Sequence, residues 1–210
     1  MMPRTVIAIA LAALIAAPTT AQDAEKQGRP FELDEVETNL ALGQPYLYSA
    51  VPGYRLTKND SDLQDLTDGE LGYRPDEKIW FDANAVAWQG EPRVSIQLDL
   101  GEVEPIGEIG IRLLGGAEQG GLKFPDQVMA LVSDDAQNWS EVGRFNRLDP
   151  QDIERFGVPA EEGKAWTHPL RFQDLQAVGR YVGLVIHGQT SFIATDEMWV
   201  FEGEHAVAGA

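Results

Sequence analysis

The sequence predicts an all-β protein, built as a two-sheet β-sandwich. Apolar residues alternate with polar ones in many short runs, which is the period of a strand with one buried face. Each run is bounded by Gly, Pro, Asn or Asp, and no long stretch has the 3.6-residue period of an amphipathic helix. The chain has 210 residues and no cysteine, so a hydrophobic core and not disulfides must stabilise it.

The first 21 residues have the pattern of a secretory signal peptide. Arg4 provides a positive charge, an apolar run extends from Val6 to Ala17, and Thr19 and Ala21 are small residues suited to signal peptidase. The apolar run is about twelve residues, whereas a membrane-spanning helix needs roughly twenty. We therefore favour cleavage after Ala21 over an uncleaved membrane anchor. We expect a periplasmic or extracellular protein, and the absence of cysteine is typical of bacterial envelope proteins.

The rest of the chain is expected to form one domain with two polar flanks. Residues 22–37 are rich in Glu, Asp, Gln and Gly and predict a polar linker. The sandwich domain is expected at 38–203, and residues 204–210 are a small, polar tail that we expect to be flexible.

The predicted strands follow one another through the second half of the domain. Their alternating patterns cover residues 93–100, 107–114, 127–133, 140–145, 166–172, 181–187 and 192–201. Between two of them, the Asp and Asn residues of 132–139 predict a hairpin, since both types bend the backbone readily. The polar connection 149–163 is expected to hold one helical turn that starts at Pro150.

The charge of the chain excludes some partners. It carries 16 basic and 34 acidic side chains, for a formal net charge of −18, and its Lys and Arg residues are scattered singly. Nucleic-acid binding needs a basic face, so it is not expected. Anionic membranes and sulfated glycans are disfavoured for the same reason, which leaves a neutral ligand or a cation. Solubility alone is an alternative explanation of this charge.

Catalytic motifs are missing from the sequence. Its histidines, His168, His187 and His205, stand too far apart for metal-ligand spacing. There is no Gly-x-Ser-x-Gly elbow, and the glycine cluster 115–121 lacks the Lys-Ser or Lys-Thr of a phosphate loop. We therefore predict a binding protein and not an enzyme.

A series of short motifs, taken in order and spacing, resembles the discoidin domain, also called the coagulation factor five/eight type C domain, of the galactose-binding-like superfamily. The motifs are Asn39 to Pro45, Leu66 to Gly69, Val94 to Gly101 with Pro105-Ile106, Leu131 to Asp135 with Trp139 and Val142-Gly143, Gly179 to Val182, and Thr195 to Phe201. The resemblance runs from about residue 39 to residue 203. It implies an eight-stranded jelly-roll sandwich whose loops at one end bind ligands, often exposed sugars and otherwise lipid or protein.

The resemblance also implies one structural calcium ion, held between an Asp-Gly loop and a Glu on the last strand. The matching positions are Asp68 and Glu197, with the carbonyl of Asp65 as a further ligand. Glu70 and Tyr73 depart from the pattern, since calcium-binding members often have Asn and Ser or Thr there. The alternative is that Asp68 caps a turn through backbone hydrogen bonds while Glu197 is an ordinary strand-end carboxylate.

Loop residues that combine an aromatic face with planar polar groups are the candidates for ligand contact. They are Tyr54, Arg55, Trp80, Phe81, Asn84, Trp88 and Phe192. Trp88 immediately precedes a predicted strand, so core packing is the alternative for it, and Tyr54 with Arg55 could belong to a packed loop. Trp80 and Phe81 are adjacent, so in an extended segment only one of them faces out.

Two functions follow from these residues and the resemblance. The first is a carbohydrate-binding module for the neutral sugars of a polysaccharide or glycoconjugate. The second is a protein-interaction or structural domain that recruits a partner at the cell surface. An exposed apolar patch without an aromatic-polar pocket would favour the second.

Overall fold

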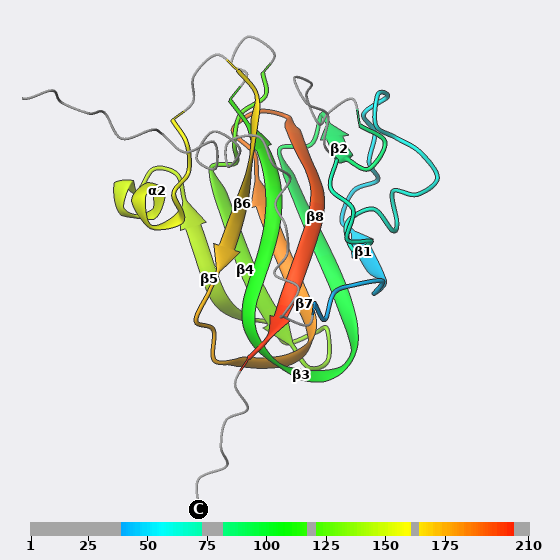
Figure 1. The fold of residues 1–210 in the computed structure, drawn as a ribbon, viewed down its shortest axis with the longest axis vertical. Coiled ribbons are helices and arrows are strands. Elements are labelled where there is room, and N and C mark those ends of the chain that lie inside the picture. Colours follow the sequence, from blue (N-terminus) through cyan, green and yellow to red (C-terminus); the bar gives the residue numbers. More distant parts are fainter. Residues whose placement is uncertain (1–38, 73–81, 117–120, 161–163, 204–210) are drawn as a thin grey trace, which may run out of the picture.

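The computed structural model describes residues 39–72, 82–116, 121–160 and 164–203, which Figure 1 draws as a coloured ribbon. The signal peptide, the linker and the tail predicted from the sequence lie outside the described residues. In the described part, no helix has the length and apolar character that crossing a membrane requires.

The described residues form an all-β structure with eight strands, as predicted (Figure 1). The strands are β1 (Tyr46–Tyr48), β2 (Val86–Gln89), β3 (Arg93–Gly115), β4 (Gln127–Ser133), β5 (Ser140–Asn146), β6 (Trp166–Phe172), β7 (Ala177–His187) and β8 (Phe192–Glu202). One short helix, α2 (Pro150–Phe156), follows β5. Asp149 caps its first turn by accepting a hydrogen bond from the Gln151 N–H, and Gly157 ends it in the left-handed conformation.

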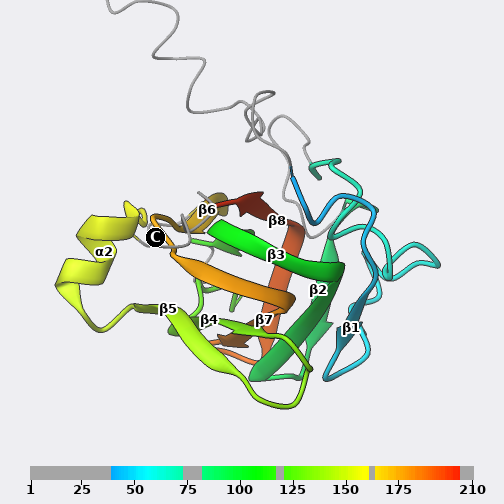
Figure 2. The same ribbon diagram turned by 90° about the horizontal axis from the view of Figure 1, so that it is seen from below.

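All strand pairs are antiparallel, and β3 takes part in both layers of the sandwich. Its first half pairs with β1 and β7, and β4 and β5 continue that layer. Its second half pairs with β6 and β8, and β2 pairs with β8 at the edge. Figure 2 views this arrangement along a perpendicular direction.

The sequence predicted two strands, 93–100 and 107–114, where the structure has one. Gly101 and Pro105 are turn residues, which is why a break was expected between the two runs. In the structure the pairing with β7 shifts register between Asp99 and Glu104, and Gly101 has a φ of 88°. The irregularity bends the strand from one layer into the other without interrupting it.

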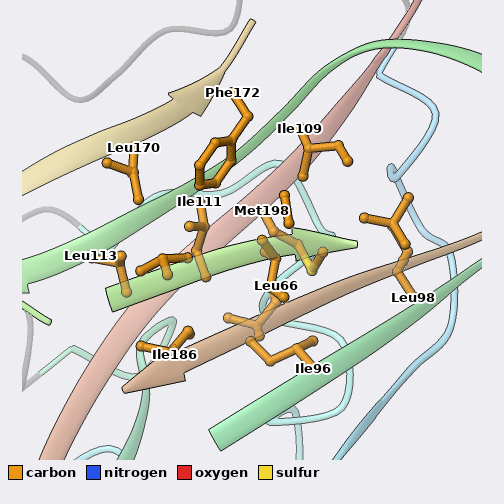
Figure 3. Close-up of a cluster of buried hydrophobic side chains, with 14 of the residues drawn as sticks. Leu66, Ile96, Leu98, Ile109, Ile111, Leu113, Leu170, Phe172, Ile186 and Met198 are labelled. Atoms are coloured by element: carbon orange, nitrogen blue, oxygen red, sulfur yellow. The ribbon is translucent and has the colours of Figure 1, made fainter. Parts of the chain in front are cut away.

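The core lies between the two layers. Ile96 and Leu98, from the first half of β3, face the core together with Ile109 and Ile111 from its second half (Figure 3). Strand alternation places these apolar side chains on the inner face, and Met198 of β8 packs among them.

The strands β1 and β2 were not predicted because they are too short for a periodic pattern. In addition, β2 is buried on both faces: Val86 and Trp88 belong to the main core, whereas Ala87 packs in a second apolar cluster. A strand buried on both sides does not alternate apolar with polar residues. The predicted hairpin between β4 and β5 is confirmed, with the Asp135 carboxylate accepting hydrogen bonds from the N–H groups of Gln137 and Asn138 at 2.8 Å each.

Candidate functional site

The structure brings together two of the predicted ligand-contact aromatics, Tyr54 and Phe192. Their ring centroids are 4.9 Å apart and the rings are perpendicular, at 89°. Tyr54 lies on the long loop after β1, and its N–H and that of Gly53 each donate a 3.2 Å hydrogen bond to the carbonyl of Ala87. Phe192 begins β8, at the end of the sandwich opposite Glu202 (Figure 1).

The two rings cover the second apolar cluster, which we call the edge cluster. It consists of Ala85, Ala87, Leu114, Leu122 and Ala194, with Tyr54, Ala165 and Phe192 packed against it. Three of its five buried members are alanines, and the larger side chains of Tyr54 and Phe192 pack against the cluster. Tyr54 and Phe192 are both half-buried residues.

Polar side chains accompany these rings. Arg55 is exposed and makes no ion pair or hydrogen bond with any described residue. Asn84 is half-buried, and its side-chain amide approaches the Glu70 carboxylate at 3.4 Å. The loop that carries Tyr54 is tied to the loop that carries Asn84 by Asn59, whose Nδ2 donates to the Ala83 carbonyl at 2.6 Å. Asn59 was not singled out from the sequence, although the run Asn59 to Asp62 has the composition of a turn.

Trp88 does not join this surface. It is fully buried in the main core, and its indole Nε1 donates a 2.8 Å hydrogen bond to the carbonyl of Ala50. The burial follows from strand alternation, because Trp88 points to the opposite face of β2 from Ala87. The structure therefore supports core packing for Trp88 over ligand contact. Trp80 and Phe81 lie outside the described residues.

Of the acidic residues proposed for calcium, Asp65 and Asp68 lie in the long loop after β1, and Glu197 lies on β8. Glu197 is fully buried: its Oε2 accepts a 3.2 Å hydrogen bond from the Gly69 N–H, while its Oε1 has no hydrogen-bond partner among the described residues. Burial raises the pKa of Glu197 to about 9, with further contributions from the negative charges of Asp68 and Asp196. Asp65 is also buried, and its Oδ2 has no partner. Burial likewise raises the pKa of the Asp65 carboxyl.

A buried carboxylate oxygen without a partner is costly unless a cation or a hydrogen-bond donor compensates it. Asp68 is exposed, and its Oδ1 accepts a 2.7 Å hydrogen bond from the Glu70 N–H, as expected of a turn-capping aspartate. Among the described residues, no three acidic or histidine side chains gather around one point. A bound ion would therefore need backbone carbonyl oxygens or water among its ligands, which calcium accepts.

A buried ion pair next to Glu197 was not anticipated. Arg112 of β3 and Asp196 of β8 are both buried; the Arg112 Nε donates to Asp196 at 2.9 Å, and its NH2 group donates to Asp196 as well as to the Gly72 carbonyl at 2.7 Å. Through Gly72, this pair connects the long loop after β1 to both strands. Arginine is usually exposed, so nothing in the sequence indicated a buried Arg112.

Comparison with known proteins relates the fold to solved structures. No family model and no curated protein sequence matches the chain. A fucose-binding module from Streptococcus pneumoniae matches with a TM-score of 0.52 at 17% identity, covering 81% of this chain and 99% of that one. A carbohydrate-binding module from Clostridium perfringens, in complex with GalNAc-β-1,3-galactose, has a TM-score of 0.50 at 17% identity, covering 78% and 99%.

The lectin domain of lectinolysin, complexed with Lewis B antigen, also has a TM-score of 0.50 at 17% identity, over 79% of this chain and 97% of that domain. The chain therefore has the galactose-binding-like, or discoidin, β-sandwich fold, and the resemblance seen in its motifs is confirmed at the level of the fold.

Proposed function

We propose that this chain is an exported, non-catalytic carbohydrate-binding module that holds neutral sugars of a polysaccharide or glycoconjugate at the Tyr54–Phe192 surface. The observation that carries the proposal is the perpendicular ring pair of the half-buried residues Tyr54 and Phe192, with the exposed Arg55 directly after Tyr54 in the chain. Sugar sites combine an aromatic face, which packs against the C–H groups of a pyranose, with planar polar groups that bind its hydroxyls.

The fold supports the proposal by analogy. Two of the matching structures were determined with sugars bound, GalNAc-β-1,3-galactose in one and Lewis B antigen in the other. A shared fold makes a shared function more probable, but the function itself depends on the residues of the site. Export is supported by the signal-peptide pattern of residues 1–21.

A glycan array followed by calorimetry tests the proposal. We expect the purified domain to bind at least one neutral glycan, and Tyr54→Ala to weaken that binding by at least about tenfold because it removes a contact ring. Tyr181→Ala is the matched control. Tyr181 is a half-buried tyrosine on β7 that packs against Arg180, away from the edge cluster. Absence of binding to every neutral glycan, or equal loss in both variants, would contradict the assignment.

The second function, recruitment of a protein partner, is favoured by a different observation. Five large apolar side chains within one segment are exposed: Leu42, Leu47, Val51, Leu56 and Leu63. Scattered apolar residues are normal on a surface, whereas exposed apolar side chains that form one patch are typical of an interaction surface. A protein retained from envelope extracts by the wild type and released by the Leu47→Ser, Val51→Ser double variant would favour this function.

We also propose one structural calcium ion beside Glu197, with Asp65 and Asp68 as the other acidic residues that would hold it. Two buried carboxylate oxygens without partners support it. A divalent cation would compensate their charge and stabilise the end of the loop.

A further inference from the structure

On the other layer of the sandwich, four strands place polar side chains in one row. Arg93 of β3 is opposite His187 of β7, His187 is opposite Gln127 of β4, and Gln127 is opposite Asn146 of β5. Neighbouring strands lie about 4.8 Å apart, so the row spans roughly 14 Å.

The row lies on the outer face of that layer. The adjoining residues on the four strands form the next row, and all of them are fully buried: Val94, Phe145, Val128 and Ile186. Because successive side chains of a strand point to opposite faces, the polar row must face away from the core.

An open hollow of about 550 Å³ lies over this row. Its lining consists of Pro92, Arg93, Asp126, Gln127, Asn146, Leu148, His187 and Gly188. The volume falls within the range of small-molecule sites, roughly 300–1,000 Å³. The hollow shares no lining residue with the edge cluster beneath Tyr54 and Phe192.

The polar groups of the row have hydrogen-bonding capacity to spare. Within the described ranges, the Arg93 guanidinium, the Gln127 amide and the His187 ring form no hydrogen bond or ion pair. The Asn146 Oδ1 accepts from the Leu148 N–H at 3.1 Å, which leaves its Nδ2 available.

Arg93 differs in this from most arginines of the described part. Five of them are paired with carboxylates: Arg112, Arg144, Arg147, Arg171 and Arg180.

The local charge of the hollow is opposite in sign to that of the molecule. The one carboxylate in the lining, that of Asp126, is compensated by Arg147, whose Nε lies 3.2 Å from its Oδ1. Burial and the positive charges of Arg93 and Arg144 lower the pKa of His187, which favours its neutral form. Arg93 is thus an uncompensated cation in a chain whose net charge is −18.

We propose that this hollow is a second binding site, specific for a uronic acid residue of an acidic polysaccharide. Arg93 binds the sugar carboxylate in a two-pronged hydrogen bond, while Gln127, Asn146 and His187 bind ring hydroxyls. Leu148, which is 77% exposed, packs against the apolar edge of the sugar. The inference rests on the proposed function for the class of ligand, but not on the Tyr54–Phe192 surface.

Calorimetry of the full mature chain with trigalacturonate, with the neutral galactose trisaccharide and with acetate tests the site. We expect trigalacturonate to bind most tightly and Arg93→Gln to weaken it by at least about tenfold, because a charge-assisted contact is lost. Arg155→Gln is the matched control: it removes the same charge from an exposed arginine of α2 that belongs to neither proposed surface, and it should leave trigalacturonate binding within about twofold. The side-chain amide resonances of Gln127 and Asn146 should shift only with the uronate.

Three results would overturn the uronate site: trigalacturonate binding no tighter than the neutral trisaccharide, binding unchanged in Arg93→Gln, or acetate binding as tightly as trigalacturonate. The proposed function fails on different results: either no neutral sugar binds, or neutral-sugar binding is unchanged in Tyr54→Ala.

Discussion

At the residue scale, the Glu197 carboxylate is in an environment that disfavours its ionised form. Its burial, and secondly the negative charges of Asp68 and Asp196, raise its pKa, and one of its oxygens has no partner within the described part of the chain. Only Asp196 has a buried cationic partner, in Arg112. Without a bound cation the folded protein favours protonated Glu197, which makes the folded state less stable as the pH rises towards 9.

This predicts opposite effects of Glu197→Gln with and without calcium. In chelator at pH 7.5, the variant should melt at a higher temperature than the wild type, because a neutral amide avoids the burial of a charge. At a calcium concentration about a hundred times Kd, the wild type should gain roughly 5–10 °C and the variant nothing. Thermal melts followed by circular dichroism measure both effects.

Glu102→Gln is the control for that experiment, because it makes the same carboxylate-to-amide change at an exposed residue. A wild type that does not respond to calcium would rule out the ion. A full response in Glu197→Gln would place the ion elsewhere.

The aromatic residues show what could be predicted of the site. Tyr54 and Phe192 were chosen for their place on loops, and the structure puts their rings in contact. Trp88 was chosen on the same grounds, but it is buried in the core. Its burial could not be recognised from the sequence because β2 has only four residues, too few to show an alternating pattern. The row from Arg93 to Asn146 could not be predicted, since it depends on the register of four strands that are distant in sequence.

At the scale of elements, the Arg112–Asp196 pair connects three segments. Arg112 belongs to β3, Asp196 to β8, and Gly72, whose carbonyl Arg112 also binds, to the long loop after β1. Both side chains are buried, so each charge is compensated only while the other is present. The pair therefore holds the loop that carries Tyr54 against the sheet.

Arg112→Met should reduce the free energy of unfolding by about 3–5 kcal/mol, because Asp196 is left buried and unpaired. The double variant Arg112→Met, Asp196→Leu should be more stable than the single one, since the unpaired charge is gone. Arg144→Met is the control: it breaks an exposed pair with Glu141 and should cost less than about 1 kcal/mol. Urea titrations distinguish these outcomes, and equal losses for Arg112→Met and Arg144→Met would contradict the role of the buried pair.

The long strands were the predictable elements because they have one buried and one exposed face. The limits of β4 and β6 agree with the predicted ranges 127–133 and 166–172. β3 was divided in the prediction because Gly101 and Pro105 are turn residues. The chain does turn back at this point, as Figure 1 shows, but its pairing with β7 continues through the turn, which a local pattern does not reveal.

At the scale of the whole molecule, the net charge of −18 opposes compaction. Raising the ionic strength from about 10 mM to 0.15 M shortens the Debye length from about 30 Å to about 8 Å, which screens this repulsion. In the presence of chelator, we expect the urea midpoint to rise over that interval. A constant or falling midpoint would show that attractive pairs outweigh the repulsion.

The order of the discoidin-like motifs allowed the overall fold to be predicted from the sequence, whereas the ligand remains a matter of side-chain placement. Motifs such as Val94 to Gly101 specify strands and their turns, which are common to sandwiches with different ligands. The residues that bind are few, and they come from separate loops and strands.

The passage of β3 through both layers bears on how the protein folds. Residues 93–99 pair with β7, and residues 106–115 pair with β6 and β8. The two layers share this continuous strand and one hydrophobic core, so the loss of either layer exposes the inner face of the other to water. The sandwich is thus a single cooperative unit, in which the amide hydrogens of both layers should exchange with solvent only through one common opening.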